Sequence, residues 1–416
     1  MKQWKIHRLP CGLQVLIVQS LESQVSHCGL LIGAGTREEK EEEAGLAHFI
    51  EHCLFKGTRK RRAYHILNRL ETVGGELNAY TTKEETCLHA SVMDEHLERA
   101  LELISDIAFH SVFPVREIDK EKDVIIDEIN SYQDTPYEQI FDDFEGLVFA
   151  GHPLGHPILG TNQSVRSFRQ RQLKEFTAKH YHAGNMVLAI STSQSEDKVL
   201  RVVERHFSAV RSGAGRPPRH KARKSRPVSK EDSRALSQVH FISGRAAYGL
   251  HHPDRYALVL LNNLLGGPGM NSILNLRIRE RYGYTYTIES GYHTFTDNGI
   301  FHIYFATDER NYKRVLALLG KELDILTGKP LTERQLNQYK EQLVGQIRLA
   351  QESRLSVLLS MAKSLLNLGR VLTQDEVFNR IRSVNSSQLS SVARDILDPA
   401  GRSELIYRPA VSAGVS

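Results

Sequence analysis

One short segment of the sequence combines two imidazoles and a carboxylate at a spacing suited to metal chemistry. The segment is His48-Phe49-Ile50-Glu51-His52, within a stretch of helical period at residues 46–55. Histidines four residues apart project from one helix face about a turn apart, so both rings can bind the same metal ion. Glu51 lies near that face and can reach a water on the metal without binding the metal itself. The pattern predicts a zinc site at which activated water attacks a carbonyl and a carboxylate accepts the proton.

The residues around this segment favour a buried helix over an exposed one. They are apolar nearly all round the helix: Leu46, Ala47, Phe49, Ile50, Cys53, Leu54 and Phe55. Buried histidine and glutamate side chains need polar partners, and a metal ion supplies one. The alternative is a pair of surface histidines on an ordinary helix.

A catalytic zinc site usually has three protein ligands, so the segment needs a further ligand from elsewhere. A second predicted helix, at residues 116–131, contains Glu121 and Glu128, which are two turns apart on one face. One of the two can bind the metal while the other accepts a hydrogen bond from a ligand histidine. The alternative for either residue alone is a solvated helix face.

The elements that must position these side chains alternate between strands and helices. Predicted strands lie at residues 11–35 (two strands and a turn), 77–80, 87–92 and 185–192. Predicted helices lie at residues 46–55, 63–73, 94–109, 116–131, 167–180 and 195–207. This alternation indicates an α+β fold with a mixed sheet.

A basic segment separates this half of the chain from a second half with a similar order of elements. From Arg211 to Lys230 the charged residues are all lysine or arginine, and three prolines interrupt the segment. We interpret it as a solvated linker; the alternative is a patch that attracts acidic partners. Strands at 238–243, 284–292 and 299–307, with helices at 255–265, 270–282 and onward to about 397, then repeat the earlier order. We therefore predict two homologous domains, 1–210 and 235–416, joined by a linker at 211–234.

The composition excludes several classes of protein. The 416 residues are 40% hydrophobic and 25% charged, as in globular rather than disordered or fibrous chains. A net charge of +5 gives no indication of nucleic-acid binding, and no apolar run is long enough to span a membrane. Cys11, Cys28, Cys53 and Cys87 form no C-x-x-C pair and indicate reduced thiols. Because the N-terminus has no apolar targeting segment, we expect a bacterial cytoplasmic protein, or a mitochondrial matrix protein if a presequence has been removed.

Four segments carry a resemblance to a known family. They are residues 33–39 (GAGTREE), 45–58 (GLAHFIEHCLFKGT), 75–82 (GELNAYTT) and 121–128 (EKDVIIDE). In this order they resemble the pitrilysin/insulinase zinc metallopeptidases, whose H-x-x-E-H order makes them inverzincins. The resemblance covers nearly the whole chain. Its length and duplication are similar to the short-chain branch that includes the mitochondrial processing peptidase β subunit and its bacterial relatives.

The resemblance implies a role for each candidate residue of the metal site. It implies one Zn²⁺ per chain, bound by His48, His52 and Glu128, with Glu121 behind a ligand histidine and Glu51 as the base.

The resemblance also extends to residues outside the metal site. Residues 279–286 (RERYGYTY) resemble the family's C-terminal Arg/Tyr element, which implies that Arg279 and Tyr286 hydrogen-bond the developing oxyanion. It places Asn78 and Ala79 on an edge strand that pairs with extended substrate. For all four residues, the alternative is an ordinary structural role.

We therefore expect a zinc-dependent endopeptidase whose two homologous α+β domains, each a mixed sheet packed with helices, close as a clamshell on short or unfolded peptides. The family's short chains pair, which implies a homodimer or a heterodimer with a related subunit. Two alternatives stay open within the same fold: a presequence-processing peptidase subunit and a non-catalytic structural subunit. A third is a protein that binds acidic partners through the basic linker.

Overall fold

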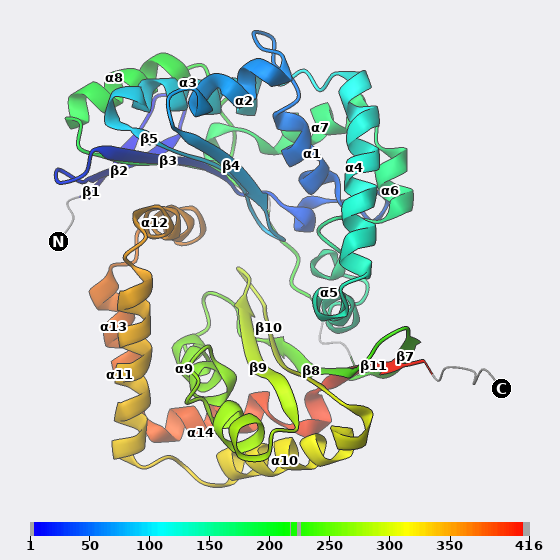
Figure 1. The fold of residues 1–416 in the computed structure, drawn as a ribbon. Coiled ribbons are helices and arrows are strands. Elements are labelled where there is room, and N and C mark those ends of the chain that lie inside the picture. The colour runs from blue at the N-terminus through cyan, green and yellow to red at the C-terminus, as the bar shows by residue number, and fades with distance from the viewer. Residues whose placement is uncertain (1–3, 217, 223–225, 411–416) are drawn as a thin grey trace. The chain divides into compact units, whose positions relative to one another are not determined.

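The chain folds into two compact units in a computed structural model that describes residues 4–216, 218–222 and 226–410. Unit 1 comprises the described parts of Met1–Asn130, His156–Arg219 and Ala350–Leu372; unit 2 comprises the described parts of Ser131–Gly155, His220–Leu349 and Thr373–Ser416. Each unit has one mixed β-sheet with helices packed on it (Figure 1). The predicted α+β fold class with two units is confirmed. Residues 217 and 223–225 of the predicted linker lie outside the described residues.

The sheet of unit 1 has six strands in the order β1-β2-β6-β3-β5-β4. Strands β2 and β6 are parallel, and the other neighbours are antiparallel. The strands are β1 (Trp4–Arg8), β2 (Gln14–Gln19), β3 (Val25–Ile32), β4 (Glu76–Thr81), β5 (Thr86–Met93) and β6 (Met186–Thr192). Strand β4 therefore lies at an edge of this sheet.

Helices cover both faces of the sheet of unit 1. They are α1 (Leu46–Leu54), α2 (Ala63–Glu71), α3 (Leu97–His110), α4 (Val115–Gln133), α6 (Asn162–Ser167), α7 (Gln170–His180), α8 (Glu196–Phe207) and α12 (Arg354–Leu368). Along β2, Val15 and Ile17 join the larger core with α1, α3 and α8, while Leu16 and Val18 point to the opposite face. There they pack with three residues of α12: Leu358, Ala362 and Leu365.

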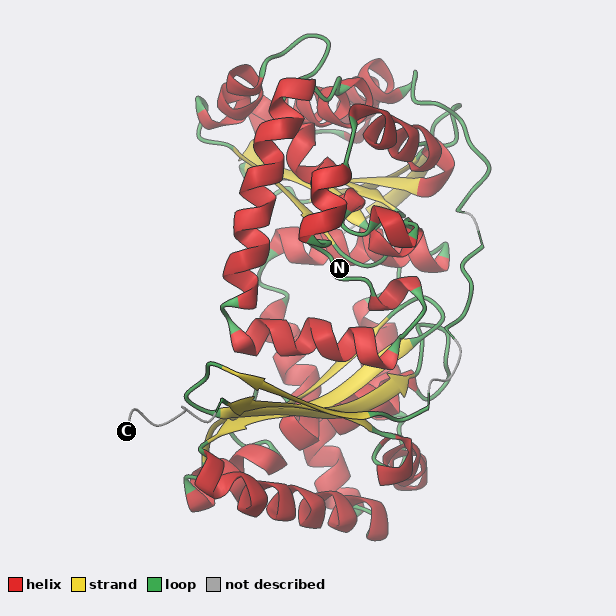
Figure 2. Ribbon diagram, turned by 90° about the vertical axis from the view of Figure 1, so that its right-hand side faces the viewer, coloured by secondary structure: helices red, strands yellow, loops and turns green. Residues whose placement is uncertain are grey.

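The sheet of unit 2 has five strands in the order β7-β11-β8-β10-β9, with β7 and β11 parallel and the other neighbours antiparallel. The strands are β7 (Ser229–Arg234), β8 (Val239–Ala247), β9 (Thr285–Thr294), β10 (Gly299–Thr307) and β11 (Ser403–Pro409). The helices are α5 (Pro136–Val148), α9 (Arg255–Gly266), the π-helix η6 (Asn275–Glu280), α10 (Glu309–Gly328), α11 (Glu333–Ala350), α13 (Gln374–Arg382) and α14 (Ser386–Ile396). Helices lie on both faces of this sheet (Figure 2).

The two sheets share one topology. If β2, β6, β3, β5 and β4 are matched in turn with β7, β11, β8, β10 and β9, the strand orders and the single parallel pair agree. Each sheet also receives one helix from the other half of the chain. Helix α5 precedes the linker yet packs on the sheet of unit 2, and α12 follows the linker yet packs on the sheet of unit 1. For this reason the compact units do not follow the continuous predicted limits of 1–210 and 235–416.

Two further observations concern the expectations from composition. Within the described part of the chain, none of the helices has the length and apolar character needed to cross a membrane. The four cysteines are all free thiols, and Cys28, Cys53 and Cys87 are buried.

Candidate metal centre

Helix α1 is fixed at its N-terminus by a glycine and a buried carboxylate. Gly45, just before the helix, has φ +89°, and a Cβ there would lie 2.6 Å from the carbonyl oxygen of Leu159. The Glu39 carboxylate accepts hydrogen bonds from the backbone N–H of Gly45 at 2.9 Å and of Ala47 at 2.7 Å. These bonds satisfy donors that the first turn of a helix leaves free. The start of the helix that carries the H-x-x-E-H motif is therefore strongly specified.

The two histidines of the motif lie together on α1. The ring centroids of His48 and His52 are 4.6 Å apart, as expected for residues one turn apart. Burial, with a smaller effect of the His52 charge, lowers the pKa of His48 to about 3. The His48 ring is therefore neutral at physiological pH and can offer a lone pair to a metal.

Helix α4 brings a carboxylate to the same place. The Oε2 atom of Glu128 lies 3.9 Å from Nε2 of His48 and 3.7 Å from Nε2 of His52. One donor atom from each of the three residues lies within 4.8 Å of the others. Two donors bound at about 2.0–2.1 Å to one tetrahedral zinc would be roughly 3.3 Å apart. The three side chains thus fit a zinc ion of the His₂Glu type after small adjustments.

Glu121 occupies a different position, on the far side of His52. Its Oε1 lies 3.0 Å from Nδ1 of His52, and its Oε2 lies 2.7 Å from Nζ of Lys56. Burial alone would raise the pKa of the Glu121 carboxyl, but its contacts with His52 and Lys56 outweigh burial and lower it. An ionised Glu121 therefore holds His52 with Nε2 turned toward Glu128, the arrangement expected for a residue behind a metal ligand. Of the two glutamates that the sequence left as alternatives, the structure places Glu128 with the donors.

The carboxylate of Glu51 lies beside this group but is not one of the three converging donors. Its Oε2 atom is buried and has no hydrogen-bond partner among the described residues. Burial raises the pKa of the Glu51 carboxyl, against smaller opposing effects of Thr81 and of the His52 charge. A partly desolvated carboxyl with a raised pKa is the usual form of a general base or acid.

The remaining predicted site residues lie on two strands and the π-helix. Asn78 and Ala79 are on the edge strand β4, where Asn78 is exposed and Ala79 packs against the core. In unit 2, Arg279 lies exposed in the π-helix η6, a rare element that is frequent at functional sites, and Tyr286 on β9 is 82% exposed. The roles of these four residues at the metal centre stay predictions.

Sequence reasoning gave no role to Lys56, which binds Glu121, or to Glu39, which binds the start of α1. Lys56 lies in the turn just after α1, only four residues beyond His52. Glu39 had no local signal, because its contact with α1 depends on the path of the connecting loop. On α4, Val124 is half exposed and Ile126 is buried.

Comparison with known proteins supports this picture. Residues 14–162 match the family model of insulinase (peptidase family M16), and residues 167–343 match that of the peptidase M16 inactive domain. The uncharacterized zinc protease YmxG of Bacillus subtilis is 32% identical over 398 residues, which cover 94% of this chain and 95% of the relative. An uncharacterized zinc protease of Mycobacterium leprae is 32% identical over 394 residues, covering 94% and 88%.

Solved structures show a likeness of fold. A peptidase M16 inactive domain from Pseudomonas fluorescens superposes with a TM-score of 0.91 at 19% identity, covering 99% of this chain and 100% of that chain. A protease from Helicobacter pylori superposes with a TM-score of 0.89 at 19% identity, covering 98% and 100%. With the family models and the zinc proteases that match almost end to end, these findings show that the chain belongs to the insulinase family, peptidase family M16.

Proposed function

We propose that this protein is a zinc-dependent endopeptidase that hydrolyses peptide bonds in short or unfolded peptides. The observation that carries the proposal is the convergence of His48, His52 and Glu128 on one point, with Glu51 beside them and outside the donor set. A metal site that serves structure alone has no need of a further carboxylate such as Glu51, whose Oε2 has no hydrogen-bond partner among the described residues. The complete set therefore favours an enzyme over a non-catalytic subunit of the same fold.

Each residue of unit 1 has a distinct task in the proposed reaction. His48, His52 and Glu128 would hold one zinc ion, and Glu121 would keep His52 oriented. When bound, zinc would lower the pKa of a water molecule and polarise the scissile carbonyl. Glu51 takes the proton of the attacking water and passes it to the leaving amine.

Residues of unit 2 and of the edge strand complete the proposal. Arg279 and Tyr286 donate hydrogen bonds to the oxyanion that forms when the carbonyl is attacked. An extended peptide pairs with β4 at Asn78 and Ala79, through main-chain bonds that tolerate many sequences. Closure of the two units as a clamshell on the peptide is part of the proposal.

We further propose that the chain pairs, with itself or with a related subunit, and that it works in the bacterial cytoplasm. The two zinc proteases described above are bacterial, and the four free thiols suit a reducing compartment. Light scattering of the purified protein tests self-pairing: a mass near twice 47.1 kDa supports it, and a mass near 47.1 kDa contradicts it.

The experiment that tests the enzymatic proposal measures metal content and peptide cleavage together. Purified protein should contain one zinc per chain and cleave members of a mixed peptide pool. A chelator should abolish the cleavage, and added zinc should restore it. A parallel pool of basic amphipathic peptides tests the alternative of presequence processing, which predicts cleavage of that pool alone. Protein that binds no divalent metal, or that cleaves equally well without it, contradicts the proposal.

A further inference from the structure

One arginine of the basic linker is buried in a network of charges. The Arg219 side chain is only 9% exposed, whereas Lys221, Arg226 and Lys230 of the same segment are exposed. Along this part of the chain, unit 1 extends as far as Arg219. At this residue the expected solvated linker instead packs into the folded unit.

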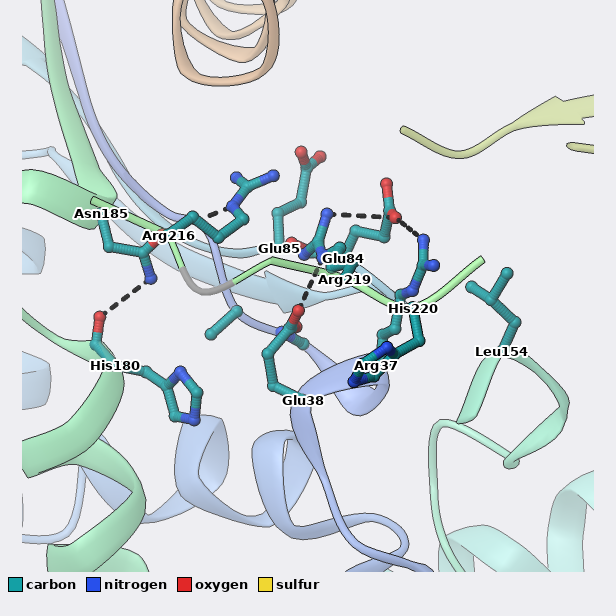
Figure 3. Close-up of polar contacts among 12 residues, drawn as sticks. Arg37, Glu38, Glu84, Glu85, Leu154, His180, Asn185, Arg216, Arg219 and His220 are labelled. Carbon is teal, nitrogen blue, oxygen red and sulfur yellow. Dashed lines mark hydrogen bonds and ion pairs between the residues drawn. The ribbon is translucent and has the colours of Figure 1, made fainter. Parts of the chain in front are cut away.

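Arg219 contacts two loops that are distant from it in the sequence (Figure 3). Its Nε donates to Oε1 of Glu38 at 2.7 Å, Nη1 lies 3.0 Å from Oε1 of Glu84, and Nη2 donates to the backbone carbonyl of Glu84 at 2.9 Å. The side chains of Glu38 and Glu84 are 8% and 11% exposed. Charge-assisted bonds to buried carboxylates are strong and specific in geometry, so this contact fixes both loops.

The loop that contains Glu38 leads directly to α1, the helix that carries His48 and His52. Glu38 is followed by Glu39, whose carboxylate binds the backbone N–H of Gly45 and Ala47 at the start of α1. A displacement of Glu38 therefore acts on the cap of the helix that carries the histidines.

The loop that contains Glu84 joins the edge strand β4 to β5. It is already tied to the first loop by the backbone bonds from Thr36 to Thr82 and from Arg37 to Lys83. The Arg37 side chain also binds Glu84, at 2.6 Å. Arg219 adds a further link between the two loops, because its single guanidinium binds Glu38 in one loop and Glu84 in the other.

A second linker arginine supports this placement. Arg216 donates from Nη1 to Oδ1 of Asn367 at 2.9 Å. It also donates from Nε to Oδ1 of Asn185 at 3.4 Å (Figure 3). Asn185 lies just before β6, and Asn367 lies in α12, so this arginine is bonded to parts of unit 1 on either side of the linker in the sequence.

We propose that Arg219 is a positioning residue for the metal centre. It acts on α1 through Glu38 and Glu39, and on the end of β4 through Glu84. The linker then helps to position the residues of the metal centre, in addition to joining the two halves of the chain. The fold and the three-donor geometry are enough for this inference, which needs no peptide cleavage to be tested.

The test compares Arg219→Ala with Arg226→Ala, which removes the same charge from an exposed position of the same segment. Hydrogen exchange is followed in the metal-free full-length protein at the amides of Gly45 and Ala47, with α8 as a remote reference in the same unit. In Arg219→Ala we expect exchange at Gly45 and Ala47 to become about tenfold faster or more, with α8 unchanged. Arg226→Ala should behave as the unaltered protein.

Two further measurements separate positioning from general stability. Zinc binding to Arg219→Ala should weaken by up to about tenfold, as for loss of other groups that support ligands. Arg219→Lys keeps the charge but loses the forked set of guanidinium donors. Its zinc affinity should lie between those of Arg219→Ala and the unaltered protein. If Arg219→Ala unfolds, the double variant Arg219→Ala/Glu38→Gln, which removes the unpaired buried carboxylate, takes its place.

Two results overturn the inference. One is unchanged exchange at Gly45 and Ala47 in Arg219→Ala. The other is an equal rise at α8, which would show that Arg219 stabilises unit 1 as a whole. Because exchange and zinc binding are measured without peptide, a protein that binds zinc and cleaves nothing would contradict the proposed function and leave this inference standing.

Discussion

Glu121 contacts His52 through Nδ1, and we expect this contact to strengthen zinc binding at the proposed site. Glu121→Gln keeps the size of the side chain but loses the charge that accepts the hydrogen from Nδ1 of His52. Loss of such a partner typically costs about 10–100-fold in metal affinity. We therefore expect zinc binding to weaken by that factor, as measured by competition with a chromogenic chelator. Glu117→Gln, one turn earlier on α4 where Glu117 binds Lys120 near solvent, should bind zinc normally. Equal affinities in the two variants would contradict this role of Glu121.

The pKa values of the two histidines predict how zinc binding depends on pH. In the metal-free protein, burial lowers the pKa of His52, but the Glu121 hydrogen bond and the charges of Glu128 and Glu121 outweigh it and raise the pKa above 6.5. His48, with a pKa of about 3, carries no proton at pH 6.5. Because its pKa is raised, His52 must lose a proton for zinc to bind at that pH.

Calorimetry in buffers of different ionisation enthalpy measures this release. Glu121→Gln should release fewer protons when zinc binds, because the pKa of His52 falls when its hydrogen-bond acceptor loses its charge. Any proton lost by water at the site is common to both proteins and cancels in the difference. The same release from both proteins would show that Glu121 does not control the protonation of His52.

The residues of the site were predictable to different degrees. The spacing of His48 and His52 is a local property of one helix, so the sequence alone indicated a metal site. The choice between Glu121 and Glu128 was not local, because both lie on the same face of α4. It depends on how α4 packs against α1. The family resemblance favoured Glu128, which the structure places beside the two histidines. The contact of Arg219 depends on the whole course of the chain and had no sequence signal.

At the scale of elements, Gly45 determines how α1 begins. Gly45→Ala would strain a residue at φ +89° and bring a Cβ to 2.6 Å from backbone atoms of Leu159 and Gly160. Gly74→Ala is the matched control, since Gly74 has φ +71° but nothing within 4 Å of a Cβ. Both variants bear the cost of positive φ, of about 1 kcal/mol, and only the first adds a clash.

Urea unfolding of the two variants gives the comparison. We expect Gly45→Ala to lose more unfolding free energy than Gly74→Ala, by at least about 1 kcal/mol. It should also bind zinc more weakly, because the cap of the metal helix is displaced. Equal losses in the two variants would show that the loop at Leu159 gives way freely.

The elements that the sequence predicted well are those with a strong period of their own. Helix α1 and strands β5, β8 and β10 lie within a few residues of the predicted ranges. The predicted helix at 167–180 corresponds to α7, whereas α5 and α6 were not predicted. Strand β7 has the sequence SKEDSR, which lacks apolar alternation, and it forms by parallel pairing with β11. Such pairing is a tertiary property that local patterns do not contain.

At the scale of the whole molecule, the exchanged helices change how the chain can be dissected. A fragment ending at residue 210 would lack α12, and would expose the face of the unit 1 sheet that packs on Leu358, Ala362 and Leu365. The repeat along the sequence gave no indication of this exchange, because a helical period does not show which sheet a helix covers. Contributions of unit 2 are therefore best tested by substitutions in the full chain.

Tyr286→Phe is the substitution that tests whether unit 2 takes part in the reaction. It removes one hydroxyl from an exposed side chain and leaves the ring in place. If the hydroxyl stabilises the oxyanion, kcat should fall by about 10²–10³-fold with little change in KM. Tyr282→Phe, at a nearby tyrosine whose ring stacks on Tyr284, should have normal kinetics. A normal kcat in Tyr286→Phe would contradict the proposed part of this hydroxyl in the reaction.

The most direct test of the central claim is the zinc content of Glu51→Gln and Glu128→Gln, measured beside their peptide cleavage. Glu51 is proposed as the base and Glu128 as a ligand, so the two variants should fail in different ways. We predict that Glu51→Gln retains one zinc per chain and loses about 10²–10⁴-fold in turnover. Glu128→Gln should lose most of its zinc. Full turnover in Glu51→Gln, or loss of zinc from Glu51→Gln with retention in Glu128→Gln, would contradict the account.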